Sequence, residues 1–119
     1  MPVHERIDYL EFPAKDLVAT KHFFASVFDW EFEDYGSEYT AFSDQSMRGG
    51  FFKSEQSSRT SAGSALVVFY SADLESTQTK ISDAGGVIVE PIFSFPGGRR
   101  FHFTDPSGNE FAVWSDSGL

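Results

Sequence analysis

The strongest constraint on the fold is an internal repeat with a period of 57 residues. Segments 9–17 and 66–74 are both apolar runs that end in an Asp-Leu pair, and the shift places Asp16 on Asp73. An Asp at the start of a helical pattern caps the helix, because its carboxylate accepts hydrogen bonds from the first free amides. Each half is therefore predicted to begin with a strand that leads into a capped helix.

The residues after each Asp show the periodicity of an amphipathic helix. Apolar and small side chains recur in steps of three, four and three, which is the spacing of one helix face. The second helix is expected to end at the pair of glycines at 85–86, because glycine is common at helix C-termini. The predicted faces are Leu17, Thr20, Phe24 and Val27 in the first half, and Leu74, Thr77, Ile81 and Ala84 in the second.

Three short strands are expected after each helix, separated by turn residues. Segment 54–64 is rich in Ser, Gln, Thr and Gly without apolar periodicity and is predicted to be a linker. The sequence thus predicts one α+β domain over residues 1–119, with tandem β-α-β-β-β modules at about 5–53 and 65–116. The predicted strands are 31–35, 38–42 and 47–53 in the first half, and 87–90, 92–95 with 99–104, and 110–115 in the second.

Composition limits the classes of function. A length of 119 residues suits one domain, and 14 Phe supply apolar area for a core. The absence of Cys excludes a disulfide framework, a thiolate zinc site and a cysteine nucleophile. A net charge of −9 argues against nucleic acid as a partner. Because no signal peptide and no apolar run of about 20 residues are visible, a cytoplasmic protein without a membrane partner is expected.

A second motif lies near the C-terminus, where residues 103–111 have the sequence Phe-Thr-Asp-Pro-Ser-Gly-Asn-Glu-Phe. Pro106 presets φ for a turn, and Gly108 permits φ above zero. Together with the strand-Asp-Leu-helix opening of each half, this motif resembles the glyoxalase/bleomycin-resistance/dioxygenase superfamily, also called the vicinal oxygen chelate (VOC) superfamily. The motif is similar to that family's aromatic-x-Asp-Pro-x-Gly-Asn hairpin, and the resemblance covers nearly the whole chain.

The resemblance implies half-barrels around a concave cleft, a homodimer and, in many members, a divalent metal chelated in the cleft. The family's metal-ligand positions fall here on Tyr9, Leu66, Ala112 and a residue within 49–52. Leu, Ala, Gly and Phe offer no donor atom and neutral Tyr is a poor one, so no metal ligand set and no cofactor are expected. Other members of the family bind a small molecule without a metal.

Strand alternation selects the side chains that face the cleft. A pairing of Thr104 with Glu110 would place His102 opposite Ala112, and Arg100 opposite Trp114. The predicted cleft residues are Tyr9, Glu11, Tyr70, Arg100, His102, Glu110 and Trp114.

Within this set, Glu11 is the first candidate for a catalytic base, because its strand is otherwise apolar, and His102 is the second. The residues Tyr9, Tyr70, Arg100, Glu110 and Trp114 are candidates for substrate binding. A displaced metal site of Glu11, His102 and Glu110, holding nickel, iron, manganese or zinc, is one alternative. The other is that Glu11 and Glu110 form ion pairs with Arg100.

Three functions follow from these residues. The leading hypothesis is a protein that binds a planar or cationic small molecule in an aromatic cleft without a metal, through stacking or cation–π contact. The first alternative is a glyoxalase-like lyase or isomerase that uses a displaced divalent metal or Glu11 as a base. The second is a regulatory or structural dimer with a vestigial cleft.

Overall fold

The structure, a computed structural model, describes residues 2–117 and contains two successive modules with the same order of elements. A short 3-10 helix, η1 (Thr60–Ala62), lies between the modules. The predicted α+β arrangement of two β-α-β-β-β units is confirmed. The elements are β1 (Tyr9–Ala14), α1 (Leu17–Phe28), β2 (Glu31–Asp34), β3 (Tyr39–Ser43) and β4 (Arg48–Lys53), then β5 (Val67–Tyr70), α2 (Leu74–Asp83), β6 (Val87–Phe95), β7 (Gly98–Thr104) and β8 (Glu110–Ser115).

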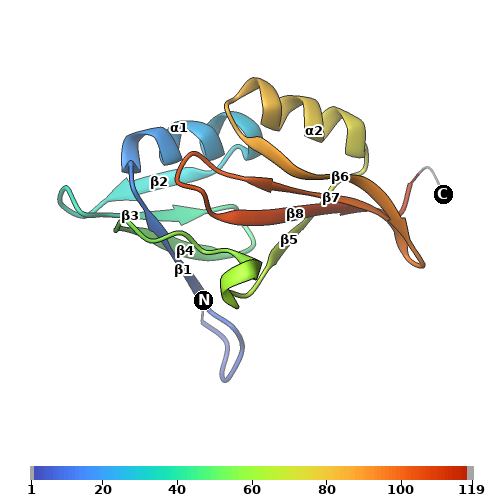
Figure 1. The fold of residues 1–119 in the computed structure, drawn as a ribbon. Helices are drawn as coiled ribbons and strands as arrows, with labels where there is room; N and C mark the ends of the chain where they lie inside the picture. The colour runs from blue at the N-terminus through green and yellow to red at the C-terminus, as the bar shows by residue number, and fades with distance from the viewer. Residues whose placement is uncertain (1, 118–119) are drawn as a thin grey trace.

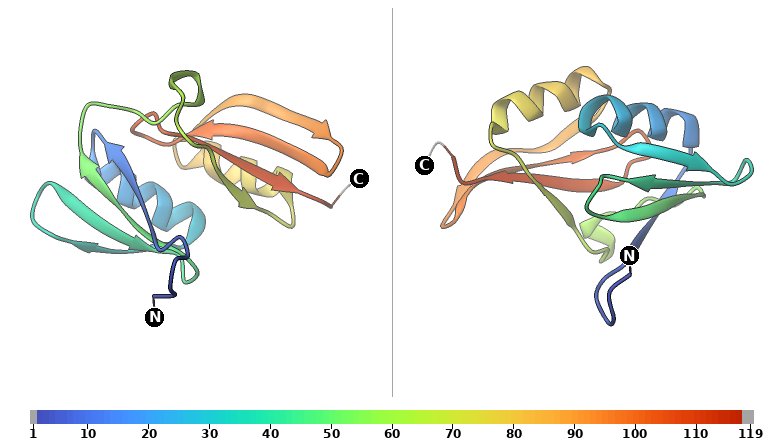
Figure 2. Two further views of the ribbon diagram at one scale, coloured as in Figure 1. Left: turned by 90° about the horizontal axis from the view of Figure 1, so that it is seen from below. Right: turned by 180° about the vertical axis from the view of Figure 1, so that it is seen from behind.

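Each module folds its strands into a four-stranded mixed sheet. The strand orders are β1-β4-β3-β2 and β5-β8-β7-β6, so the first strand of each module lies at a sheet edge, parallel to the last strand. The two sheets are not joined into a closed barrel within the described chain. Both helices lie on the same side of the molecule, and the view from below shows the sheets in front of them (Figures 1 and 2). We call the side of each sheet that is turned away from its helix its open face.

Both predicted helix caps are present. The Asp16 carboxylate accepts from the Ala19 amide at 3.0 Å, and the Asp73 carboxylate accepts from the Ser76 amide at 3.1 Å. Neither α1, with 12 residues, nor α2, with 10, is long and apolar enough to cross a membrane.

One continuous aromatic core joins the modules on the helix side. The ring of Phe24 on α1 lies 5.5 Å from Phe51 of the first sheet and 5.5 Å from Phe111 of the second. Phe12 on β1 also contacts Phe111, with ring centroids 5.2 Å apart. Because Phe24, Phe51 and Phe111 are fully buried, this packing fixes the two sheets relative to each other.

One predicted strand boundary is wrong. Residues 87–90 and 92–95 were expected to be separate strands, whereas β6 runs continuously from Val87 to Phe95. The ladder with β7 shifts register on both sides of Glu90. Pro91 lacks an amide donor, but β6 is the edge strand of its sheet, and edge strands and bulges tolerate proline.

The Asp-Pro-Ser-Gly-Asn turn between β7 and β8 is hydrogen-bonded to the first module and to the intermodule segment. The Asn109 side chain donates from Nδ2 to the Pro13 carbonyl at 2.7 Å and accepts at Oδ1 from the Ser58 amide at 2.8 Å. The Ser107 hydroxyl accepts from the Lys15 amide at 3.0 Å. These bonds tie the β7–β8 hairpin to the first module and to the intermodule segment.

Candidate functional site

The register of the second sheet places three aromatic side chains and one arginine in a row across the strands. Arg100 is paired with Trp114 on β8 and with Phe93 on β6, and Trp114 is paired with Tyr70 on β5. Residues paired in this way lie on the same sheet face. The row across the open face is therefore Tyr70, Trp114, Arg100 and Phe93. The guanidinium lies 5.6 Å from the Phe93 ring centroid, within cation–π distance.

The predicted β7–β8 register is confirmed. Thr104 pairs with Glu110, His102 with Ala112, and Arg100 with Trp114. The structure therefore brings together five of the seven predicted cleft residues. These are Tyr70, Arg100, His102, Glu110 and Trp114.

A hydrogen-bonded chain runs along this open face from Arg100 to Glu110. Arg100 Nη2 lies 2.9 Å from His102 Nε2, and His102 Nδ1 lies 2.9 Å from Glu110 Oε2. A guanidinium only donates, so Nε2 must accept and the imidazole proton resides on Nδ1. With both ring nitrogens engaged, His102 is placed as a positioning residue that links the arginine to the carboxylate.

Glu110 is held from the opposite end by the intermodule segment. Its Oε1 accepts from the Thr60 amide at 3.0 Å and from the Thr60 hydroxyl at 2.8 Å, and Arg59 Nε lies 3.8 Å away. Burial alone would raise the pKa of Glu110, but the hydrogen bonds from His102 and Thr60 outweigh it and lower this pKa to about 2. Glu110 is therefore an anchoring anion.

The other two predicted residues lie on the first sheet. Tyr39 donates its hydroxyl proton to Glu11 Oε2 at 2.8 Å, and the hydroxyl oxygens of Tyr39 and Tyr9 are 2.6 Å apart. Because the single proton of Tyr39 is committed to Glu11, Tyr9 must be the donor to Tyr39. The result is a relay from Tyr9 through Tyr39 to Glu11, on the open face of the first sheet.

Tyr39 is a site residue that was not predicted from the sequence, as are Phe93 and Thr60. Burial first, and then its bonds to Tyr9 and Glu11, raise the pKa of the Tyr39 hydroxyl well above its ordinary value. A Cβ on Gly50 would lie 2.0 Å from the Tyr39 hydroxyl oxygen. The glycine thus makes room for the tyrosine, and a glycine inside a predicted strand is the signal that could have indicated this close approach.

The predicted ion pairs from Glu11 and Glu110 to Arg100 are wrong. Glu11 is on β1 and bonds to Tyr39, whereas Arg100 is on β7 in the other sheet. The Glu110 carboxylate accepts hydrogen bonds from the His102 side chain and from Thr60. The two acidic candidates therefore serve separate clusters on separate sheets.

The side chains do not fit the divalent metal that many family members would hold here. Within residues 2–117, no group of three or more His, Cys, Asp or Glu side chains is gathered closely enough to bind a metal ion. In the displaced set of Glu11, His102 and Glu110, both imidazole nitrogens are already engaged, and one of them faces the guanidinium of Arg100. A metal ligand needs a free lone pair away from a fixed positive charge.

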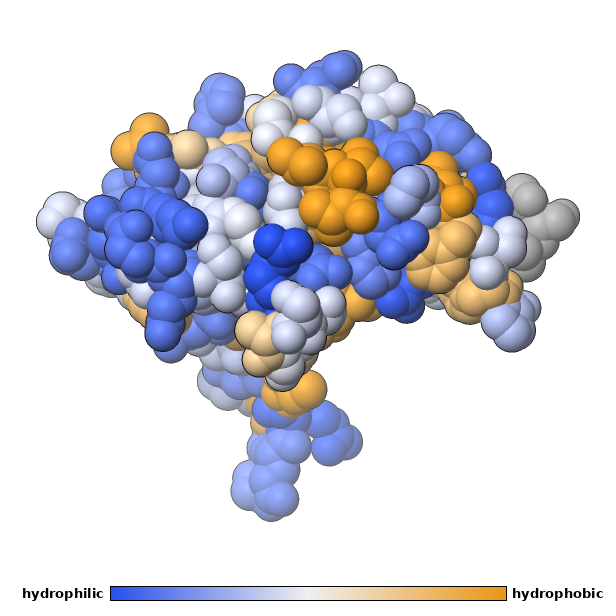
Figure 3. All heavy atoms as spheres, in the orientation of Figure 1, coloured by the Kyte–Doolittle hydropathy of each residue, from blue (hydrophilic) through white to orange (hydrophobic). Residues whose placement is uncertain are grey.

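Exposed apolar side chains concentrate on the second sheet. Five of the ten exposed large hydrophobic side chains described in the structure lie on β5 and β6: Val68, Tyr70, Val87, Val89 and Phe93. Figure 3 shows a mainly hydrophilic side of the molecule with apolar side chains gathered over the second module. Val68 and Tyr70 lie on one edge strand of this sheet, and Val87, Val89 and Phe93 lie on the other.

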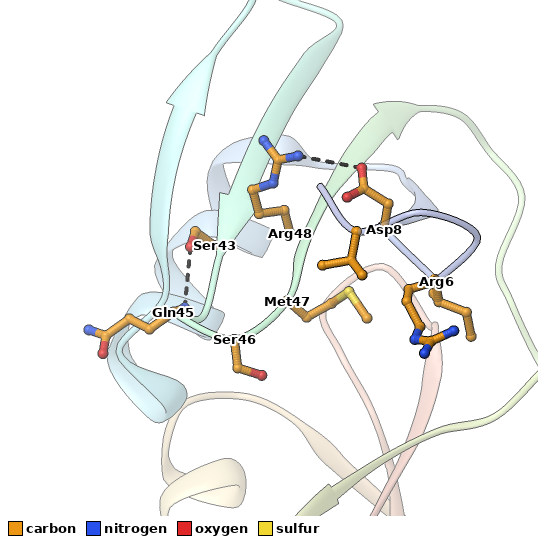
Figure 4. A pocket seen from close by; sticks show the side chains of 9 residues that line it. Arg6, Asp8, Ser43, Gln45, Ser46, Met47 and Arg48 are labelled. Carbon is orange, nitrogen blue, oxygen red and sulfur yellow. Dashed lines mark hydrogen bonds and ion pairs between the residues drawn. The ribbon is translucent and has the colours of Figure 1, made fainter. Parts of the chain in front are cut away.

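Several hollows in the described structure lie outside the polar chain, among them an apolar one and a polar one. An apolar hollow of about 380 Å³ between β1 and β5 is lined by Trp30, Phe42, Phe69 and Tyr70, among others. A polar hollow of about 320 Å³ lies between the N-terminal segment and the β3–β4 turn. Figure 4 shows that its Arg48 is directed toward Asp8, with a closest separation of 3.4 Å, so this cation already has a partner.

Solved structures share this fold at low sequence identity. The fosfomycin resistance protein FosX from Listeria monocytogenes superposes with a TM-score of 0.78 and 17% identity, covering 95% of this chain and 94% of that one. A glyoxalase-related enzyme from Fulvimarina pelagi gives 0.77 and 15%, covering 93% and 88%. Lactoylglutathione lyase from Agrobacterium tumefaciens gives 0.70 and 22%, covering 93% of each chain.

No curated protein sequence is significantly similar to the chain. The family model described as Glyoxalase/Bleomycin resistance protein/Dioxygenase superfamily matches residues 6–113, which is nearly the whole length. Together with the duplicated fold, this match shows that the chain belongs to the glyoxalase/bleomycin-resistance/dioxygenase superfamily.

Proposed function

We propose that this protein binds a planar small molecule on the open face of the second sheet, without a metal ion. The observation that carries the proposal is the aromatic row that surrounds Arg100, next to the chain through His102 to Glu110. Aromatic walls supply most of the binding area in small-molecule sites, and a few fixed polar groups orient the ligand.

The aromatic side chains leave surface for a ligand. Phe93 and Tyr70 are 36% and 55% exposed, and the Tyr70 and Trp114 rings meet edge to face at 5.2 Å. The polar floor is rigid, because Glu110 is anchored by Thr60 and in turn holds His102. A preorganised floor of this kind reduces the entropy lost on binding.

The test is a thermal-shift screen of planar aromatic compounds. At a ligand concentration 100-fold above Kd, binding stabilises the protein by about 2.7 kcal/mol, which raises Tm by several degrees. A Trp114→Ala variant should lose at least tenfold in affinity for the hits, whereas Tyr35→Ala, an exposed aromatic of the first module, should not. Full affinity of the Trp114→Ala variant for every hit would refute this assignment of the site.

A second candidate function is metal-free lyase or isomerase chemistry with Glu11 as the base. The relay from Tyr9 through Tyr39 supports it, because it gives the carboxylate a fixed orientation and a route for a proton. Lactoylglutathione lyase activity measured in excess chelator should then persist and fall at least 100-fold in Glu11→Gln. Activity that chelator abolishes, or that Glu11→Gln retains, would exclude this role.

We propose further that the protein works as a cytoplasmic homodimer. In the described chain, β1 and β5 each pair along one side only and carry exposed Tyr9, Val68 and Tyr70. A second copy packed on these edge strands would cover their exposed side chains. Analytical ultracentrifugation should give twice the mass of one chain, and Val68→Lys should shift the protein toward the monomer.

A further inference from the structure

The guanidinium of Arg100 on the second open face lacks a carboxylate partner among the described residues. The chain as a whole carries a net charge of −9, yet no carboxylate of the described residues lies within ion-pair distance of Arg100. The carboxylate nearest along the polar chain, Glu110, is engaged by His102 and Thr60. Glu90, which is paired with His102 in the β6–β7 ladder, is exposed and forms no ion pair with Arg100 in residues 2–117.

In the part of the chain that the structure describes, the neighbouring Arg99 has the carboxylate partner that Arg100 lacks. Arg99 points to the helix side, where Nη1 and Nη2 donate to the two oxygens of Glu75 at 2.6 and 3.2 Å. Arg100 donates only once in the described structure, from Nη2 to His102. Its Nε is buried without a partner, as is the Nε of Arg99. A guanidinium has five N–H donors in a fork that matches a carboxylate.

His102 determines how this fork is presented. Because Nδ1–H is committed to Glu110, Nε2 is left as an acceptor that holds the Nη2 end of Arg100. The Phe93 ring on β6 contacts the same guanidinium, with its centroid 5.6 Å from the guanidinium carbon. The cation is therefore held in place between an imidazole and an aromatic ring, with donors to spare.

We propose that this face selects a planar ligand that carries one carboxylate or a similar oxyanion, anchored by Arg100 and packed against Trp114. The inference rests on the proposed function and names the charge class of its ligand. It keeps the planar ligand expected from the sequence and departs from the cationic alternative, because a cation beside Arg100 would meet its unpaired charge. An oxyanion supplies the acceptors that the guanidinium lacks, and charge-assisted bonds of this kind are the stronger ones.

The experiment uses three probes with one ring system and different charges: 2-naphthoate, 2-naphthylmethanol and 2-naphthylmethylammonium. Binding to the full chain is followed by NMR, through the indole N–H signal of Trp114 and the Nε–H signal of Arg100. We expect 2-naphthoate to bind at least tenfold more tightly than the ammonium probe. It should shift both signals, whereas the alcohol should shift only that of Trp114.

Substitutions distinguish a direct contact with the Arg100 guanidinium from the general effect of a positive charge. Arg100→Gln should weaken 2-naphthoate at least tenfold and leave the alcohol within about twofold, whereas Arg99→Gln, which removes the same charge from the adjacent residue, should change neither. Arg100→Lys keeps the charge but not the fork and should give an intermediate affinity. Circular dichroism and thermal unfolding verify that each variant is folded. If Arg100→Gln does not fold, the affinity of Arg100→Lys for 2-naphthoate decides the matter.

The outcomes distinguish this inference from the proposed function. If the alcohol and the ammonium probe bind at Trp114 as tightly as 2-naphthoate or more tightly, the oxyanion preference is wrong and the small-molecule site stands. Equal losses in the Arg99 and Arg100 variants would also overturn the inference. If none of the three probes perturbs the Trp114 signal, the assignment of the site to this face falls, and the inference falls with it.

Discussion

Replacing Asn109 with Ala should destabilise the protein strongly, although the residue lies in a turn. The side chain is fully buried and makes three hydrogen bonds: to the Pro13 carbonyl at 2.7 Å, from the Ser58 amide at 2.8 Å and to Asp105 Oδ2 at 3.2 Å. The first two reach β1 and the intermodule segment, across 96 and 51 residues of sequence. The substitution would therefore loosen the contact between modules as well as the turn itself.

The magnitude follows from the groups that lose their partners. An unsatisfied buried donor or acceptor costs about 1–3 kcal/mol. The Pro13 carbonyl and the Ser58 amide are both in partly buried surroundings, so water replaces part of each bond and the cost lies toward the lower end of that range. Two such groups and the small cavity give an expected loss of about 3 kcal/mol in the free energy of unfolding.

Urea unfolding followed by circular dichroism measures this loss, with Thr79→Ala as the control. The Thr79 hydroxyl bonds only within α2, to the Glu75 carbonyl at an exposed position, so its removal should change stability by less than about 0.5 kcal/mol. Asn109→Asp keeps the volume and the acceptor for Ser58 but loses the donor to Pro13, so it should also destabilise at pH 7. A loss below about 1 kcal/mol for Asn109→Ala would refute the proposed role of this turn.

Three further predictions concern the two open faces and the helix caps. The pKa of Glu110 is about 2 in the folded protein against an ordinary 4.5. Its contribution to stability is therefore complete above about pH 4.5 and is lost as the pH falls toward 2, and Glu110→Gln should flatten urea-derived stability across that window. Gly50→Ala would place a methyl group 2.0 Å from the Tyr39 hydroxyl oxygen, so the tyrosine must move; ultraviolet titration should show an altered Tyr39 pKa, and an unchanged one would contradict the close approach. Asp16→Ala and Asp73→Ala each remove one N-cap bond and should each cost about 1 kcal/mol in thermal unfolding.

Much of the architecture was predictable because it is encoded locally. The helix faces follow from a period of 3.6 residues, and each cap needs only an Asp within three residues of the amide it binds. The β7–β8 register follows from the short turn that joins those strands. For this reason the pairing of Arg100 with Trp114 was predicted correctly from the sequence.

The parts that could not be predicted depend on contacts between segments far apart in sequence. Tyr39 reaches Glu11 across 28 residues, because β3 and β1 flank β4 and Gly50 leaves space between them. Thr60 reaches Glu110 across 50 residues, because the intermodule segment passes beside the end of β8.

The sequence by itself determined two β-α-β-β-β modules, their caps and the hairpin register. Only the tertiary structure decided that Glu11 belongs to a tyrosine relay on one sheet, while Arg100 stands without a carboxylate partner in residues 2–117 on the other. The physical reason is that periodicity fixes which face a side chain occupies, whereas the packing of the sheets on a shared core fixes which faces meet.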